Sequence, residues 1–487
     1  MTAKKKLIEI TDQEIERIYD SGKEATVAFI KVIISKLNDL AEVVEKQQQE
    51  IEELKARINK DSHNSNKPPS TDDPFKKKTK SLRKKGGKAG GQKGHKGTNL
   101  KRNENPDRIE PLKVTGDCQC GREKTAGEHA GYEIRQVVDL PEIKMKVTDF
   151  QAEILKCECG EVHTAEFPPE VTSKVQYGTN IKSLIVYLKH YGFMSYERIA
   201  EFIEDVAGQK ISQGTLVNMI NECASKLNPV VEKIRETLTE EPVVHFDETG
   251  IRIDASLHWL HIAGNDKYTV YLPHKRRGKP AMDEMNILPH FRGIAVHDHW
   301  DSYYKYQQCL HSLCNAHHLR ELNFFEEQGG KWAIKIKRCL LNAKEEKDNN
   351  PDLGEERRRF YRSKMQRLIN EGLKIHPKRK KTIKKRGRPK QSKAHNLLFR
   401  MKKSLDDVLR FTHIVKVPFD NNQGERDARM AKVQQKVSGA FRSLEGAISF
   451  SIIRSYMSTA RKQGLSVYEA IVAGLKNRMI IGINCTE

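Results

Sequence analysis

Apolar residues recur at alternating steps of three and four along positions 24–59, which predicts one long helix with a heptad seam. The seam comprises Ile30, Ile33, Leu37, Leu40, Val44, Gln47, Ile51, Leu54 and Ile58. Gln47 is its single polar member and would fix the register or the number of partners. We expect a coiled coil through which the chain self-associates, although one amphipathic helix packed on its own domain would show a similar stripe.

Helical periodicity returns at residues 179–228. Ser195 is a good N-cap for one helix, Gly208 interrupts the pattern, and a second helix starts near Ser212. Two short amphipathic helices with a tight connection suit a helix-turn-helix, but any helical bundle has the same pattern.

The later part of the chain first favours strands and then helices. Strands are expected at Val243–Ile253, Leu257–Ala263, Tyr268–Leu272 and Ile294–His297. A basic helical stretch follows from Lys331 to about Arg410, and residues 423–477 are helical again. Upstream, alternating runs at Glu133–Val138 and Lys144–Phe150 also predict short strands.

Charge narrows the class of partner. The 487 residues include 87 Lys and Arg against 65 Asp and Glu, a net charge of +22. Such an excess favours a polyanion, with nucleic acid ahead of a membrane surface, although a solvated basic surface would have the same composition. The chain contains no run of about 18 uncharged apolar residues, which a membrane-spanning helix would need. Nine cysteines, an odd and sparse set, favour a reducing compartment and metal binding over disulfides.

Two segments are strongly basic. Residues 60–105 hold 14 Lys and Arg against four Asp and Glu and few large apolar side chains, which predicts a flexible arm. Its Lys84, Lys85 and Lys88 would neutralise DNA phosphates, unless the arm is only a solubilising linker. Arg386 and Arg388 flank a glycine in a basic run that resembles a minor-groove AT-hook, or a generic basic loop.

Cysteine and histidine spacing suggests metal sites. Two pairs, each followed by glycine, could hold one structural Zn²⁺ as a zinc-ribbon-like module, or they are surface thiols. These pairs are Cys118 with Cys120 and Cys157 with Cys159. A second cluster comprises Cys309, His311, Cys314, His317 and His318. A second zinc site is one interpretation of this cluster. We favour another, in which His317 and Arg320, one helical turn apart, orient the core or contact phosphate.

Three carboxylates lie where strands end or a helix begins. Asp247 and Asp298 each follow an apolar run, and Glu425 lies where a strand or loop gives way to a helix. Such acids can converge on a pair of Mg²⁺ (or Mn²⁺) ions about 4 Å apart, which activate a water or a DNA 3′-hydroxyl. Glu248 would face away from Asp247 because successive strand residues alternate. Glu321 and Asp420 are rivals for the third position.

Several motifs together resemble the DDE transposases of the insertion-sequence sixty-six family, from about residue 30 to 460. They are Asn64–Ser70, Gly90–Gly97, Tyr177-Gly178 with the Ser195–Leu216 helices, Asp247–Gly250, Asp298 with Tyr303, Cys314–Arg320, and Asp420–Asn422 with Glu425 and Arg429. The resemblance implies a ribonuclease H-like core with Asp247, Asp298 and Glu425 as catalytic metal ligands. The long gap before Glu425 (425 − 298 = 127 residues) indicates a helical insertion.

The sequence therefore predicts a multidomain α+β protein. Its expected parts are an N-terminal helix and coiled coil (1–59), a basic linker (60–107), the zinc-binding module (108–172), a helical DNA-binding region (173–240), the first part of an α/β ribonuclease H-like core (241–330), the basic helical insertion (331–412), and the end of the core with C-terminal helices (413–487). Arg426 and Arg429 would contact DNA beside Glu425.

The resemblance implies an enzyme that binds the ends of its own mobile element, cleaves their 3′ ends and joins them to target DNA. Double-stranded DNA, a second copy of the chain and helper proteins are the expected partners, at the nucleoid of a prokaryotic cytoplasm. Two alternatives stay open. One is a catalytically silent DNA-binding regulator of the same fold, and the other is a ribonuclease H-like nuclease or resolvase that does not join strands.

Overall fold

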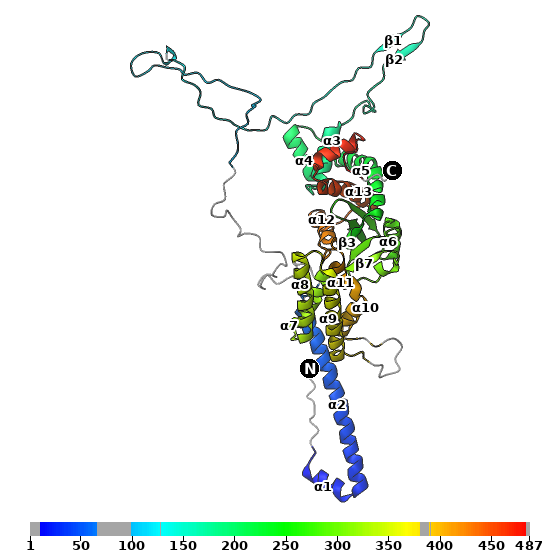
Figure 1. The fold of residues 1–487 in the computed structure, drawn as a ribbon. Helices are drawn as coiled ribbons and strands as arrows, with labels where there is room; N and C mark the ends of the chain where they lie inside the picture. Colours follow the sequence, from blue (N-terminus) through cyan, green and yellow to red (C-terminus); the bar gives the residue numbers. More distant parts are fainter. Residues whose placement is uncertain (1–9, 66–98, 127, 380–388, 390, 484–487) are drawn as a thin grey trace. The chain divides into compact units, whose positions relative to one another are not determined.

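The computed structural model describes residues 10–65, 99–126, 128–379, 389 and 391–483 (Figure 1). The chain forms two units. Unit 1 comprises Thr239–Asp247, Asn286–Glu425 and the described part of Met1–Lys78, and unit 2 comprises Glu248–Met285 and the described parts of Thr79–Leu238 and Arg426–Glu487. The predicted mixed α+β class is confirmed. None of the described helices combines the length and the apolar character needed to cross a membrane.

A five-stranded mixed sheet has the order β5-β4-β3-β6-β7. Its strands are β3 (Val243–Ile253), β4 (Ser256–Gly264), β5 (Thr269–His274), β6 (Ile294–His297) and β7 (Leu310–Leu313). Strand β6 is parallel to β3 and β7, and β4 is antiparallel to β5. All four residues of β6 are buried, as a central parallel strand requires. The predicted bounds of β3 and β6 are confirmed, and β7 was not predicted.

In unit 1, five helices enclose one hydrophobic core. They are α7 (Asn315–Glu327), α8 (Lys331–Asn349), α9 (Gly354–Ile375), α10 (Lys393–Lys403) and α11 (Leu405–His413). Leu322, Ile336 and Met365 are fully buried where α7, α8 and α9 pack together. The helical stretch predicted after Lys331 is therefore present, and it has a core that includes the preceding α7.

The long N-terminal helix is also present, as α2 (Lys23–Ile58) after the short α1 (Asp12–Asp20). The apolar residues of its predicted seam are all exposed. Just beyond α2, Asn64 Nδ2 donates to Glu327 Oε2 (2.6 Å) on α7, and Asn323 Nδ2 donates to the carbonyl oxygen of His63 (3.3 Å). The helix is confirmed, and its pairing into a coiled coil stays a prediction.

Unit 2 is built largely from helices α3 (Thr179–His190), α4 (Tyr196–Ala207), α5 (Gln213–Glu240), α6 (Lys279–Met285), α13 (Leu444–Lys462) and α14 (Val467–Leu475). The predicted helix start at Ser195, the break at Gly208 and the second start near Ser212 are confirmed, whereas α5 runs to Glu240, beyond the predicted helical stretch of residues 179–228. Ser195 Oγ caps α4 by accepting from the Arg198 N–H (3.3 Å), and Gly208 ends α4 with a left-handed φ of 66°. Ser212 Oγ accepts from the Thr215 N–H (3.2 Å) at the start of α5.

The edge strand β5 is covered by α13. The Thr269 N–H donates to Thr459 Oγ1 (3.1 Å), and the Tyr271 N–H donates to Ser455 Oγ (2.9 Å). Hydroxyl groups of a helix thus satisfy backbone donors that a further strand would otherwise pair with. This explains why α13 carries buried serine and threonine on a face where leucine would be usual.

The strands predicted at Glu133–Val138 and Lys144–Phe150 are absent, so this prediction was wrong. The residues of both runs are almost all exposed, and no neighbouring strand pairs with them. An alternating pattern forms a strand only where a partner satisfies its backbone and covers its apolar face. The antiparallel pair in this region is instead β1 (Ile154–Lys156) with β2 (Val162–Thr164), around the second cysteine pair.

Candidate active site

Two of the predicted acids lie on neighbouring parallel strands: Asp247 is in the middle of β3, and Asp298 directly follows the last residue of β6. Strand β3 pairs with β6 in a register that places His245 beside Val296. The pairing ends there, and continuing the same register past the end of β6 would bring Asp247 beside Asp298. Both residues are half-buried, and Asp298 Oδ1 accepts the Trp300 N–H (3.0 Å) in the turn after β6. Both aspartates belong to unit 1.

Glu248, the next residue on β3, belongs to a different environment. Its carboxylate is only 2% exposed and forms an ion pair with Arg277 (2.6 Å) in unit 2. The separation of Asp247 and Glu248 onto opposite faces, expected from the alternation of a strand, stays a prediction.

Glu425 lies in the first turn of α12 (Asn422–Ser438). Its backbone N–H donates to the carbonyl oxygen of Asn421 (3.1 Å), which closes that turn. Glu425 Oε1 is 3.6 Å from Arg320 Nη2 and 4.0 Å from His317 Nε2, both on α7. The same oxygen is buried and accepts no hydrogen bond from the described residues. A buried carboxylate oxygen without a hydrogen bond, on a half-exposed side chain, is suited to a cation.

Cys314, His317 and Glu425 form the single group of three or more metal-ligating side chains among the described residues, with ligand atoms within 4.8 Å of one another. Burial, and then the charge of Arg320, lowers the pKa of His317 to about 4, while the charge of Asp298 opposes this shift. Burial raises the pKa of the Cys314 thiol to about 12. At neutral pH, His317 is therefore an uncharged potential ligand, whereas Cys314 is a protonated thiol.

The rest of the predicted cysteine–histidine cluster is not one metal site. His311 Nε2 lies 3.0 Å from the carbonyl oxygen of Tyr306, and the Cys309 thiol donates to the same oxygen (3.4 Å). His318 Nδ1 lies 3.1 Å from Asn315 Oδ1. These side chains have structural partners, so the arrangement supports the orienting role that we favoured for His317 and Arg320.

The two rivals for the third acid differ from Glu425 in their surroundings. Glu321 pairs with Arg400 (2.6 Å). Asp420 Oδ1 accepts the Asn422 N–H (3.1 Å), and burial followed by the charge of Glu425 raises its pKa. Arg320 lies farther from Glu425 (3.6 Å) than Arg400 lies from Glu321 (2.6 Å), so the Glu425 carboxylate is held less closely by its ion pair.

A protein-family model described as "Transposase IS66 family" matches residues 174–449, more than half of the chain. The chain belongs to this family. A second model, a family of unknown function (DUF6444), matches residues 13–101. No curated protein matches the chain.

Membership in the IS66 family makes the protein a DNA-processing enzyme with DNA as its partner, and it implies the use of a divalent metal. The matched residues contain Asp247, Asp298 and Glu425, together with Cys314 and His317. They begin after both cysteine pairs, so the family model does not bear on the predicted zinc site.

The cysteine pairs outside the IS66 match form two similar turns. The Cys118 N–H donates to the Arg122 carbonyl oxygen and the Gly121 N–H to that of Cys118, and Cys157, Glu161 and Gly160 repeat this pattern (2.8–2.9 Å). The backbone and then the thiol of Cys120 lower the pKa of Cys118, and Cys159 does the same to Cys157. Among the described residues, no group of three or more ligands includes these exposed thiols. The zinc site stays a prediction.

The structure describes two of the seven residues that the sequence predicts to contact DNA. Lys84, Lys85, Lys88, Arg386 and Arg388 lie outside the described residues, as does the Gly90–Gly97 motif. Arg426 and Arg429 are described and exposed on α12, directly after Glu425. These two side chains therefore lie on the helix that begins at the candidate site.

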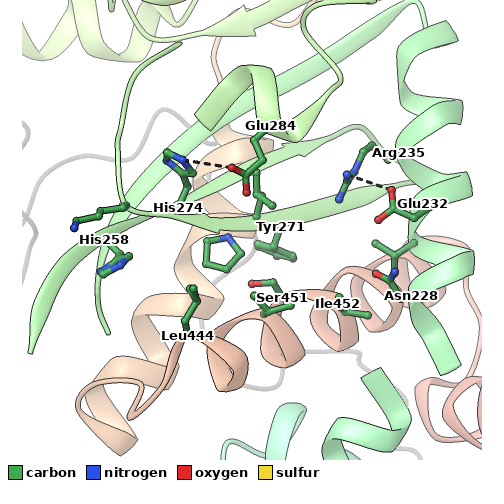
Figure 2. A pocket seen from close by; sticks show the side chains of 15 residues that line it. Asn228, Glu232, Arg235, His258, Tyr271, His274, Glu284, Leu444, Ser451 and Ile452 are labelled. Atoms are coloured by element: carbon green, nitrogen blue, oxygen red, sulfur yellow. Dashed lines mark ion pairs between the residues drawn. The ribbon is translucent and has the colours of Figure 1, made fainter. Parts of the chain in front are cut away.

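Unit 2 has a separate pocket that contains none of the predicted site residues (Figure 2). Tyr271 and Pro273 of β5 line it together with Ile452 of α13. Ion pairs between His274 and Glu284 (3.5 Å) and between Arg235 and Glu232 (3.2 Å) lie at its sides, as Figure 2 shows. Nothing in this lining resembles the acid arrangement of unit 1.

Proposed function

We propose that the protein is a metal-dependent transposase that cleaves the 3′ ends of its element and joins them to target DNA. Asp247, Asp298 and Glu425 would hold the Mg²⁺ or Mn²⁺ ions. The observation that carries this proposal is the parallel pairing of β3 with β6, whose register, extended past the end of β6, would bring Asp247 beside Asp298. Membership in the IS66 family supplies the class of reaction.

The donor set fits a hard divalent cation. Three carboxylates offer the oxygen ligands that Mg²⁺ prefers, and Glu425 Oε1 lacks a hydrogen bond from the described residues. A bound divalent ion would supply Lewis-acid activation of the attacking oxygen and stabilisation of the leaving oxygen. Cys314 and His317, beside Glu425, would suit a softer ion such as Zn²⁺. Because three carboxylates supply the oxygen ligands that Mg²⁺ prefers, we favour the oxygen ligands.

The neighbouring side chains would prepare Glu425 for this role. Arg320, at 3.6 Å, holds the Glu425 carboxylate on the side of α7 through a partly exposed ion pair. His317 stays neutral near pH 7 and so adds no charge that would repel a cation. Arg426 and Arg429 would hold DNA phosphates next to the acids.

Alanine substitution of each acid tests the proposal. The wild-type protein, incubated with element ends, a target plasmid and Mg²⁺ or Mn²⁺, should cleave and join. Asp247→Ala, Asp298→Ala and Glu425→Ala should bind DNA with unchanged affinity but lose cleavage and joining by at least about a thousandfold, the loss of several kcal/mol of transition-state stabilisation. Glu321→Ala is the matched control and should retain activity.

Gel assays of cleaved and joined products, beside fluorescence anisotropy for DNA affinity, provide the readout. A wild-type protein that binds the ends but never cuts them, even with helper proteins, would overturn the proposal in favour of a DNA-binding regulator. Cleavage without joining would instead indicate a nuclease. Activity retained by any one alanine variant would remove that residue from the site.

A further inference from the structure

Asn421, the residue before α12, is bonded through its side chain to strand β3. Its Nδ2 donates to the carbonyl oxygen of Phe246 (2.8 Å), and its Oδ1 lies 2.6 Å from His245 Nδ1. Because an amide oxygen only accepts, the histidine nitrogen must be the donor. The amide therefore uses both of its polar ends on consecutive residues of one strand, and it is only 3% exposed.

The backbone of Asn421 is fixed as well. Its N–H donates to Cys314 Sγ (3.1 Å), the residue before α7, and its carbonyl oxygen accepts the N–H of Glu425 (3.1 Å). Phe246 directly precedes Asp247. One residue thus connects the backbone beside the first proposed acid with the helical turn that carries the third.

Gly424 supports the same arrangement independently. A Cβ atom built on Gly424 would lie 3.0 Å from both Nδ2 and Oδ1 of Asn421, closer than ordinary van der Waals contact. Its own φ is not in the left-handed region, so the requirement for glycine here is one of space. The first turn of α12 lies directly against the amide, and a larger residue would displace one or the other.

We propose that Asn421 is a positioning residue that sets the separation of Asp247 and Glu425, and through it the affinity of the site for divalent metal. This inference rests on the proposed function, since it takes these two acids as metal ligands. Asn421 itself would touch neither metal nor DNA. The amide at this position donates to one backbone carbonyl and accepts from a ring nitrogen at once.

Residues that orient metal ligands typically change metal affinity 10- to 100-fold when they are replaced. Asn421→Leu keeps the size of the side chain but loses both hydrogen bonds, and Asn421→Asp loses only the donor. We expect a rise of about tenfold or more in the apparent dissociation constant for Mn²⁺ in Asn421→Leu, and a smaller rise in Asn421→Asp. Gly424→Ala, which retains the amide, should also weaken Mn²⁺ binding.

The decisive measurement is Mn²⁺ binding to the full-length protein, followed by the electron paramagnetic resonance signal of free Mn²⁺. Metal titration of the cleavage rate, DNA affinity and thermal melting accompany it. Asn422→Ala, an exposed neighbour on α12, is the matched control and should behave as wild type. A purely structural role would lower the melting temperature without moving the midpoint of the metal titration.

Each outcome of these measurements supports or contradicts the proposed role of Asn421. Wild-type Mn²⁺ affinity in Asn421→Leu, with an unshifted cleavage midpoint, overturns the inference, and Gly424→Ala decides in the same way if the leucine variant fails to fold. The Asp247→Ala variant separates the two proposals. If it binds Mn²⁺ as wild type does, the proposed metal site itself is wrong. If it loses Mn²⁺ while the Asn421 and Gly424 variants keep it, only the role of Asn421 is wrong.

Discussion

His190, at the end of α3 in unit 2, is a residue whose burial should be visible in the pH dependence of stability. It is 3% exposed, and its ring nitrogens have no hydrogen-bond partner among the described residues. Burial, reinforced by the charges of Lys189 and Arg454, lowers its pKa to about 3. Since the unfolded value is about 6.5, the unfolded chain takes up a proton first as the pH falls.

Stability that is present at pH 7 is therefore lost as the pH falls below 6.5. Between pH 7 and pH 5 the contribution of His190 should be about 2 kcal/mol. Urea unfolding at the two pH values checks this, because His190→Leu should reduce the pH-dependent loss by about that amount. Exposed His163→Leu is the control and should leave the loss unchanged. An equal loss in wild type and His190→Leu would contradict the assignment.

The three acids that we propose as metal ligands could be singled out from the sequence, whereas Asn421, which we infer to position them, could not. Asp247 and Asp298 each follow an apolar run that forms a strand, and Glu425 begins a helix, so local pattern pointed to all three. Asn421 stood in a motif, but its role depends on hydrogen bonds to residues 175 and 176 positions away. Local periodicity carries no information about such a contact.

At the scale of single elements, the outcome of each strand prediction depended on whether a neighbouring strand pairs with the segment. Strand β3 has alternating buried positions and β6 is fully apolar up to its last residue, and both were predicted to the residue. Strand β7 was missed because His311 and Ser312 interrupt its apolar pattern. Both polar side chains are buried in the fold, and no hydropathy pattern shows that.

Helix α2 carries a prediction about self-association. Its seam residues are exposed, and so is Val32 on another face of the helix. If the seam pairs with a second copy, Leu37→Asp and Leu40→Asp should each weaken association at least about tenfold, because each buries a charge in an apolar seam. Val32→Asp is the matched control and should not. Sedimentation of the wild-type protein and the variants at several protein concentrations measures this association. A wild-type protein that is monomeric at all concentrations would refute pairing through α2.

At the scale of the whole molecule, the predicted zinc site lies in a part of the chain that the IS66 match does not include. If Cys118, Cys120, Cys157 and Cys159 share one ion, the purified protein should contain about one zinc per chain, and Cys118→Ser with Cys157→Ser should lose it. Cys223→Ser, at a buried thiol elsewhere in unit 2, is the control and should retain it. Elemental analysis measures this directly. Full zinc content in the double variant, or no change in far-UV spectrum and melting on chelation, would argue against the site.

The core formed by α7 to α11 has a consequence for the time at which the proposed site can first exist. Glu425 follows Asp298 by 127 residues, and most of the intervening chain forms that core. At synthesis rates of about 5–20 residues per second, the third acid leaves the ribosome roughly 6–25 seconds after the second. A nascent or prematurely terminated chain would therefore hold two acids without the third. If the three acids form the proposed site, such fragments should be unable to cut DNA.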